Sequence, residues 1–273
     1  MRAPTAFRVR YGPTAVVVGA SEGIGAAFAE RLAAEGLDLL LVARNEERLV
    51  TFAASLSDRY RIGCRPVPAD IGLDSGVSAV RAAVAESDTG LLVYNAAFAP
   101  AGPFLGRSVE EHIQALSVNC GGLVTLSHAV GQQLVSRGRG GIIIMCSIAG
   151  MQGAPWLSTY GATKAFDISF AEALHVELSP LGVDVLGCIA GATSTPGFVR
   201  SMGPPKKKYP FYVTSPDSVA RAALKRLGKG PLVIAGGVNR TAAFVMRRFL
   251  PRNLAVRIMG SASAPADQHV GRH

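Results

Sequence analysis

The sequence has no cysteine pattern of the kind that holds a disulfide framework or a metal. Its four cysteines, Cys64, Cys120, Cys146 and Cys188, stand far apart in apolar or glycine-rich runs, with no CxxC motif and no Cys/His ligand spacing. This pattern argues against a disulfide-rich secreted domain and against a zinc module. We expect reduced thiols in the core of a cytoplasmic protein, and no metal site.

Long hydrophobic runs are also missing. No window reaches the roughly 18 apolar residues that a membrane span requires, and the apolar run near the N-terminus is too short for a signal peptide. Charged residues make up only 17% of the chain, and 31 glycines are present. This composition argues against disorder and against a coiled coil, and it suits a fold with many short turns.

Acidic residues are scarce in the last third of the chain. Of the net charge of +9, residues 1–192 carry −3 and residues 193–273 carry +12. Nucleic-acid binding predicts a recognisable module with aromatics among its basic residues, and none is present, so we expect no nucleic-acid partner. The basic, partly apolar extension at 238–273 is expected to cover a pocket, to pack against another subunit or to lie on an anionic membrane.

Short apolar runs alternate with longer segments of helical periodicity. The strands are expected at 14–19, 37–43, 61–69, 90–95, 140–147, 183–190 and 231–236. The helices are expected near 24–35, 45–59, 74–86, 109–137, 158–180 and 215–228. Nearly continuous Val/Ile/Leu strands indicate a sheet buried on both faces. The sequence therefore predicts an α/β fold: a Rossmann-type doubly wound parallel sheet of about seven strands between two helical layers, in a single domain with its core at about 12–237.

Two segments interrupt this alternation. Residues 191–214 are rich in Pro, Gly and Lys, and we expect a mobile loop over the substrate. Within it, Lys206, Lys207 and Lys208 either meet a phosphate-bearing group such as CoA or an acyl carrier protein, or are simply solvated. After the last strand, "NRTAAFVMRRFL" predicts a short helix that Pro251 ends, and the tail from Ser261 is expected to be disordered.

A glycine turn follows the first strand in "VVVGASEGIG". Gly19 permits a tight turn, Gly23 lets a diphosphate approach the backbone, and Gly25 lets the next helix pack closely. Such glycines also occur in plain turns, but the position between a strand and a helix near the N-terminus favours nucleotide binding. At the end of the second strand, Ala43 stands where an NAD-selective site has an acid, and Arg44 follows it, which predicts NADP(H).

"STYGATK" places Tyr160 and Lys164 one turn apart on a predicted helix. Alone, this is an ordinary surface pair. A phenol is a poor acid-base group at neutral pH unless its anion is favoured, and a lysine on the same helix face lowers the phenol's pKa. Ser147, at the end of the preceding strand, is placed to hydrogen-bond a substrate oxygen. The three residues together predict proton transfer to or from a carbonyl oxygen.

"GASEGIG", "AD-I" at 69–71, "YNAA" at 94–97, Asn119, Ser147 and "YGATK" resemble the short-chain dehydrogenase/reductase family in order and spacing. The segment around the first strand is most similar to the branch of 3-ketoacyl-CoA reductases and 17-beta-hydroxysteroid dehydrogenases. This resemblance implies a Rossmann-type fold, hydride transfer between a nicotinamide and a carbonyl or alcohol carbon, and a homo-oligomer, a dimer or a tetramer.

The resemblance also assigns residues to roles. It makes Asn119, Ser147, Tyr160 and Lys164 the catalytic set, with Asn119 holding a water that links Lys164 to solvent; alternatively, Asn119 is a polar residue that bends the helix. It implies cofactor contacts by Gly19, Ser21, Gly23, Ile24, Gly25, Arg44, Asp70, Ile71, Asn95, Ala96, Tyr160, Lys164, Gly191, Thr193 and Thr195. The family's usual residues are replaced at Val18, Tyr94, Ala97 and Ala190, which affects supporting positions more than the chemistry.

The sequence thus predicts an NADP(H)-dependent oxidoreductase that interconverts a ketone and a secondary alcohol. A hydrophobic, lipid-like substrate, 3-ketoacyl or steroid-like, is expected if the apolar residues near the site line a pocket rather than pack the loop: Trp156, Phe198, Met202, Phe211 and Tyr212. The alternative is a catalytically silent, NADP-binding sensor or scaffold. The alternative predicts damage to the catalytic set, which is complete.

Overall fold

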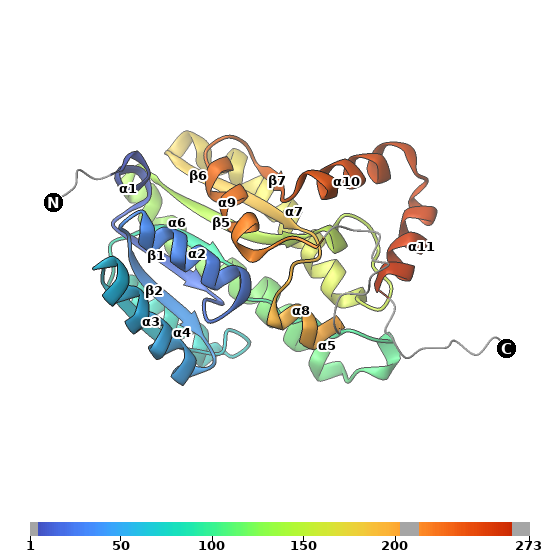
Figure 1. Cartoon of the computed structure of the whole chain (residues 1–273), viewed down its shortest axis with the longest axis horizontal. Helices are drawn as coiled ribbons and strands as arrows, with labels where there is room; N and C mark the ends of the chain where they lie inside the picture. The colour runs from blue at the N-terminus through green and yellow to red at the C-terminus, as the bar shows by residue number, and fades with distance from the viewer. Residues whose placement is uncertain (1–4, 203–212, 264–273) are drawn as a thin grey trace.

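The structure, a computed structural model, describes residues 5–202 and 213–263. Its centre is a parallel sheet in the order β3-β2-β1-β4-β5-β6-β7 (Figure 1). The strands are β1 (Thr14–Val18), β2 (Asp38–Ala43), β3 (Cys64–Pro68), β4 (Thr89–Tyr94), β5 (Gly140–Ser147), β6 (Val183–Ala190) and β7 (Leu232–Ile234). The seven predicted strands are all present, and the doubly wound topology is confirmed.

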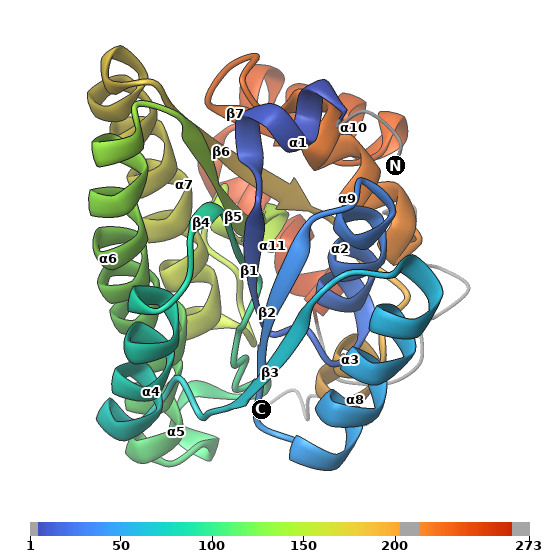
Figure 2. The same cartoon turned by 90° about the vertical axis from the view of Figure 1, so that its left-hand side faces the viewer.

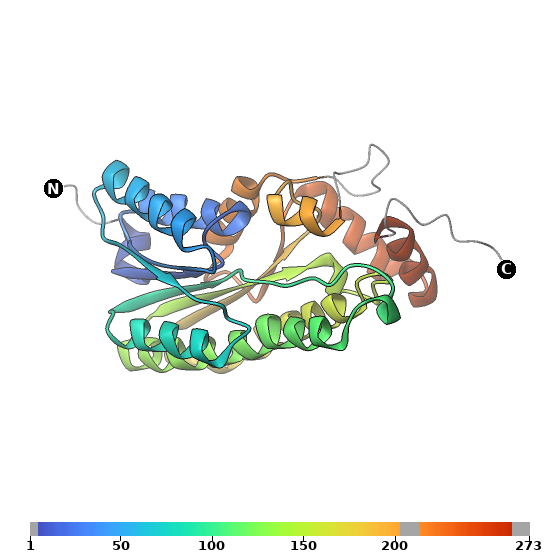
Figure 3. The same cartoon turned by 90° about the horizontal axis from the view of Figure 1, so that it is seen from below.

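Two layers of helices enclose the sheet (Figures 2 and 3). One face carries α2 (Gly23–Ala34), α3 (Glu46–Tyr60) and α9 (Pro216–Arg226). The other face carries α4 (Asp74–Ala85), α6 (Gly122–Arg137) and α7 (Ser158–Leu178). Single 3-10 turns lie at 104–106, 148–150 and 179–181.

Strand β1 shows why a continuous apolar run indicates a strand that is buried on both faces. Successive side chains point to opposite faces, and Ala15, Val16, Val17 and Val18 are all fully buried. Ala15 and Val17 belong to the core beneath α2 and α3, whereas Val16 and Val18 belong to the core beneath α4 and α6. A strand with apolar side chains on both sides is stable only between two helical layers.

The structure differs from the prediction in four places. The segment expected as one helix at 109–137 is α5 (Val109–Leu116), a π-helical turn at 117–121 and α6. The expected loop at 191–214 contains α8 (Pro196–Met202) and is joined at its ends by a bridge between Thr193 and Thr214. After α10 (Gly237–Phe249), α11 (Arg252–Ser263) continues through Ser261, so the expectation of disorder was wrong for 261–263. Lys206, Lys207 and Lys208 lie outside the described residues.

The fourth difference is α1 (Ala6–Tyr11), a short helix before β1 that periodicity did not reveal. Tyr11 is buried, and its hydroxyl donates to Asp184 Oδ2 at 2.7 Å, an oxygen that also accepts from Arg10 Nε at 2.6 Å. Burial, together with the Asp184 carboxylate, raises the pKa of Tyr11, so the phenol remains a donor. These contacts hold α1 against the start of β6, at the amino-terminal ends of the strands.

We expect Tyr11→Phe to lower the free energy of unfolding by about 1–2 kcal/mol, because a hydrogen bond to a charged, partly buried group is lost. Urea denaturation measures this change. Tyr60→Phe is the matched control, since the Tyr60 hydroxyl donates to Glu30 on a more exposed surface, and its cost should stay within about 0.5 kcal/mol. Equal costs for the two variants would mean that α1 is not fastened through Asp184.

Candidate active site

A cavity of about 650 Å³ opens at the carboxyl ends of the strands. Neighbouring strands β1 and β4 lead to crossovers in opposite directions, which is where doubly wound sheets form their crevice. Of the predicted site residues, all but Gly25 and Asn119 line this cavity: Gly19, Ser21, Gly23, Ile24, Arg44, Asp70, Ile71, Asn95, Ala96, Ser147, Tyr160, Lys164, Gly191, Thr193 and Thr195. Residues up to 176 positions apart in the sequence therefore line the same cavity.

The glycine turn at one end of the cavity has no room for side chains. Gly19 has φ +83°, and a Cβ on Gly25 would lie 1.9 Å from the Gly19 carbonyl oxygen. That carbonyl accepts a hydrogen bond of 2.9 Å from Asn95 Nδ2. Gly25 thus acts from behind the cavity, and Asn95 fixes the turn at the start of α2, whose N-terminus favours an anionic group.

The segment after β6 closes against the same turn. Thr195 Oγ1 accepts from Phe198 N at 3.0 Å and so begins α8. A Cβ on Gly23 would meet Thr195 Cγ2 at 2.9 Å. Thr193 is buried, and its hydroxyl donates to the Gly191 carbonyl at 3.0 Å. These contacts bring the glycine turn and α8 to opposite sides of one narrow space, which suits an extended dinucleotide.

Arginines gather at the end of the cavity beside β2. Arg44 has two thirds of its side chain exposed, and its Nη1 lies 4.0 Å from Asp70 Oδ2. Sequence reasoning missed Arg48, whose Nη1 donates at 2.5 Å to Glu22, and also missed Arg200 of α8, which donates to the same carboxylate. The Arg200 contact lowers the pKa of Glu22, so this carboxylate stays charged and links α3, the glycine turn and α8.

The catalytic candidates lie at the other end of the cavity. Ser147 ends β5 and accepts from Ala149 N at 3.2 Å, which leaves its hydroxyl proton for a substrate oxygen. Tyr160 lies in the first turn of α7, and Lys164 Nζ lies 5.8 Å from the centre of its ring. The ammonium therefore lies beneath the phenol, as the spacing in "STYGATK" predicts.

Lys164 is only 3% exposed, and the structure supplies it with two acceptors. Its Nζ donates to the Met145 carbonyl at 2.8 Å and to Asp167 Oδ2 at 2.8 Å. Burial by itself lowers the pKa of Lys164, but the charges of Asp167 and Tyr160 outweigh this effect and the net pKa is raised. The lysine is therefore a permanent positive charge. Asp167 was missed, although its position one turn after Lys164 was a visible signal.

Asn119 lies in the π-helical turn and is fully buried. Its Nδ2 donates to the Phe98 carbonyl at 2.9 Å and to Thr163 Oγ1 at 2.8 Å, and its Oδ1 accepts from Phe98 N at 2.8 Å. Both amide protons are thus used to join the segment after β4 to α7. This geometry makes Asn119 a brace beside Lys164; its predicted water contact stays a prediction.

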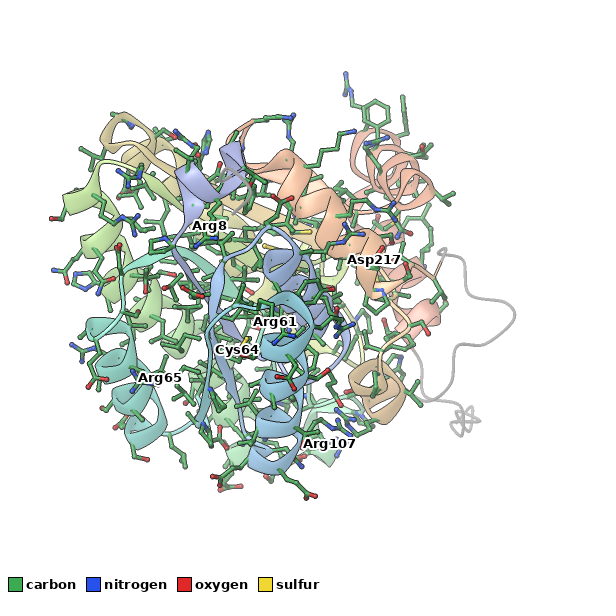
Figure 4. The ribbon with its side chains drawn as sticks, turned by 60° about the vertical axis from the view of Figure 1, so that its left-hand side comes forward. Arg8, Arg61, Cys64, Arg65, Arg107 and Asp217 are labelled. Carbon is green, nitrogen blue, oxygen red and sulfur yellow. The ribbon has the colours of Figure 1, made fainter. Side chains whose placement is uncertain are left out.

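The C-terminal extension contributes to the cavity. Met259 and Ser263 of α11 line it, and Met259 packs against Ala149, Ala154 and Leu157. Of the three roles considered for this extension, covering the pocket therefore has direct geometric support for α11. Arg107 also lines the cavity, and Figure 4 shows it well below Arg8 of α1 in that view.

The predicted apolar wall is partly present. Phe198 lines the cavity, whereas Trp156 is not among the described lining residues and adopts φ +66° just before α7. The Met202 side chain, Phe211 and Tyr212 lie outside what the structure describes.

The described histidine His112 is held by neighbouring polar groups and does not line the cavity. His112 is buried and contacts Thr159 Oγ1 at 2.8 Å and the Phe104 carbonyl at 3.1 Å. Cys146 and Cys188 are buried thiols, and Cys64 is half-buried and packs against the core beneath α2 and α3. Cys120 is half-buried, so the expectation of core thiols was wrong for this residue. Within the described ranges, no group of side chains could hold a metal ion, and no helix is long and apolar enough to cross a bilayer.

Comparison with known proteins identifies this arrangement. The model of the short chain dehydrogenase family matches residues 13–202, which include every predicted site residue. A 7beta-hydroxysteroid dehydrogenase of Mediterraneibacter gnavus is 30% identical over 257 residues, which cover 93% of this chain and 98% of the relative. The human inactive hydroxysteroid dehydrogenase-like protein 1 is 30% identical over 90% of this chain and 75% of its own.

A solved structure supports the same relationship. The short-chain dehydrogenase from Sphingobium yanoikuyae in complex with NADPH superposes with a TM-score of 0.78. It is 31% identical in sequence, and the match covers 96% of this chain and 100% of that one. These matches confirm the predicted resemblance to the short-chain dehydrogenase family, and they include hydroxysteroid dehydrogenases.

We expect Gly25→Ala to abolish NADPH binding and to destabilise the fold by about 1–3 kcal/mol, because the new methyl group overlaps the Gly19 carbonyl. Isothermal titration calorimetry measures the first effect and urea denaturation the second. Gly131→Ala in α6 is the control, since its Cβ meets nothing within 4 Å. That variant should bind normally and be unchanged or slightly stabilised, by less than about 1 kcal/mol. Normal NADPH binding by Gly25→Ala would place the nucleotide elsewhere.

Proposed function

The chain is a member of the short-chain dehydrogenase family, and we propose that it is an NADP(H)-dependent oxidoreductase that interconverts a ketone and a secondary alcohol. One observation carries this proposal. The buried ammonium of Lys164 lies beneath the ring of Tyr160 in a cavity that Ser147 also lines. A phenol, a hydroxyl and a fixed positive charge around one space are the groups that carbonyl reduction requires.

The residues divide the work of the reaction. The bound cofactor supplies hydride to the carbonyl carbon during reduction and accepts it during oxidation. Tyr160 donates its proton to the carbonyl oxygen, and Ser147 hydrogen-bonds that oxygen as negative charge develops on it. Lys164 stabilises the phenolate that remains. Asn119 contributes by fixing α7 through Thr163, which keeps Lys164 in place.

The cofactor is NADP(H), and the surroundings of β2 support this choice. Ala43 ends the strand without a carboxylate that would repel a 2′-phosphate. Arg44 extends a largely exposed guanidinium beside it, and Arg48 follows one turn later. Guanidinium groups bind phosphate through paired hydrogen bonds. The NADPH in the related Sphingobium structure agrees with this choice.

The substrate is a bulky, hydrophobic ketone or alcohol. Leu157, Phe198 and Met259 line the cavity, and Leu157 and Met259 belong to one apolar cluster with Tyr160. A steroid-like compound is favoured over a 3-ketoacyl chain, because the similarity to the 7beta-hydroxysteroid dehydrogenase extends over nearly the whole length of both proteins. Apolar lining of this kind rewards a large rigid ring system by burying its surface.

We also propose that the protein forms a homo-oligomer. Exposed apolar side chains lie on neighbouring helices of one layer: Val109, Ile113 and Leu116 on α5, Val124 on α6, and Phe166 and Val176 on α7. Exposed apolar side chains on adjacent helices favour contact with another subunit.

A catalytically silent NADP-binding protein is the second candidate, and the human relative named as inactive favours it. The complete set of Ser147, Tyr160 and Lys164 supports the enzyme instead. The two candidates differ in turnover and agree in cofactor binding.

We therefore expect NADPH oxidation with steroid ketones, measured by absorbance across a panel that also holds long-chain 3-ketoacyl thioesters and simple ketones. Tyr160→Phe should lower kcat by about 10²- to 10⁴-fold, because the proton donor is lost, while its Kd for NADPH stays within about twofold. Tyr60→Phe serves as the control with normal turnover. NADPH binding without turnover on any substrate, in the wild type as in Tyr160→Phe, would establish the silent protein.

A further inference from the structure

Asp167 is a buried carboxylate beneath the catalytic pair, and neither the sequence motifs nor the proposed mechanism uses it. It is 1% exposed and lies on α7, one turn after Lys164. Its Oδ2 accepts from Lys164 Nζ at 2.8 Å, whereas its Oδ1 is buried and has no hydrogen-bond partner among the described residues. A carboxylate with one bare oxygen in the core is costly, so its presence calls for a function.

Three titratable groups lie around the pair on different elements, and they add no charge at neutral pH. Burial raises the pKa values of Tyr94 on β4, Cys120 in the π-helical turn and Cys146 on β5, so all three stay neutral. The Tyr94 hydroxyl donates to the Val118 carbonyl and is not available to Asp167. Glu172 on α7 is exposed, and its charge contributes only weakly to the raised pKa of Cys146.

The pair itself is held as ions. Burial raises the pKa of the Asp167 carboxyl, and the charge and hydrogen bond of Lys164 oppose this rise. Lys164 Nζ donates to Asp167 Oδ2 at 2.8 Å, so each charge favours the ionised form of the other group. Burial lowers the pKa of Lys164, but the charge of Asp167 outweighs this effect and the net pKa is raised. Because the two charges lie at hydrogen-bond distance, the field that reaches Tyr160 is that of a dipole rather than of a full positive charge.

We propose that Asp167 is a positioning residue that holds Lys164 beneath Tyr160 and offsets part of its charge, so that Tyr160 keeps its proton to a higher pH. This inference rests on the proposed function and deepens it. Tyr160 gives its proton to the carbonyl oxygen when a ketone is reduced, and must have lost that proton before it can accept one from an alcohol. Asp167 therefore biases this site toward ketone reduction near neutral pH.

A substitution that removes the negative charge of Asp167 and keeps the size of its side chain tests this role. In Asp167→Asn, an amide oxygen still accepts from Lys164, but the negative charge is gone, so the phenolate of Tyr160 is favoured. The pH midpoint at which alcohol oxidation appears, measured at saturating NADP⁺, should fall by about one unit. Asp184→Asn is the matched control, because Asp184 is also ion-paired but lies at the opposite edge of the sheet. The control should keep the wild-type midpoint.

A second measurement does not depend on turnover. The protein is labelled with ¹³C at the tyrosine hydroxyl-bearing carbon, saturated with NADP⁺ and titrated by NMR, with Tyr160→Phe assigning the Tyr160 signal. Asp167→Asn should lower the pH midpoint of that signal by about one unit, and Asp167→Ser, which also removes the charge, should act in the same direction if the Asn variant does not fold. An unmoved or raised midpoint would overturn the role of Asp167. Missing turnover with a lowered midpoint would count against the proposed function alone.

Discussion

The ammonium group of Lys164 has almost no access to water, and the structure around it is arranged to keep it positively charged. Lys164 is stabilised by the Met145 carbonyl at the end of β5 and by the Asp167 carboxylate one turn along its own helix. A buried ammonium without such partners would lose its proton. The position of α7 against β5 and β6 is therefore a requirement of the chemistry as well as of packing.

The cofactor end of the cavity is set by a different constraint, the close approach of backbones. The carbonyl of Gly19 lies where a Cβ on Gly25 would be, and Asn95, the first residue after the neighbouring strand β4, donates a hydrogen bond to that carbonyl. Strands β1 and β4 are adjacent although α2, β2, α3, β3 and α4 separate them in the chain. The reversal of strand order thus brings the glycine turn and the phenol-lysine pair into one cavity, and we propose that a single dinucleotide spans both.

Much of this arrangement was predictable because its signals are local. Strands buried on both faces leave runs such as Val16–Val18, and short motifs fix Gly19, Tyr160 and Lys164 by spacing. Contacts that depend on tertiary neighbours were missed. Arg48 was not predicted because its partner Glu22 comes close only in the folded chain. Helix α1 is too short to show a helical periodicity in the sequence, and its contact with Asp184 holds it in place. Ser261 was assigned to a disordered tail because the sequence does not reveal that Met259, in the same helix, would find a wall of apolar side chains.

We propose that the Lys164 charge makes Tyr160 an effective acid-base group. The most direct measurement compares the pH dependence of alcohol oxidation in Asp167→Asn with that in Lys164→Met/Asp167→Asn. The shared Asn avoids a buried, unpaired carboxylate, which would cost about 3–5 kcal/mol of stability. We expect loss of the ammonium to raise the pH midpoint by more than about one unit and to weaken NADP(H) binding. An identical midpoint in the two variants would contradict it.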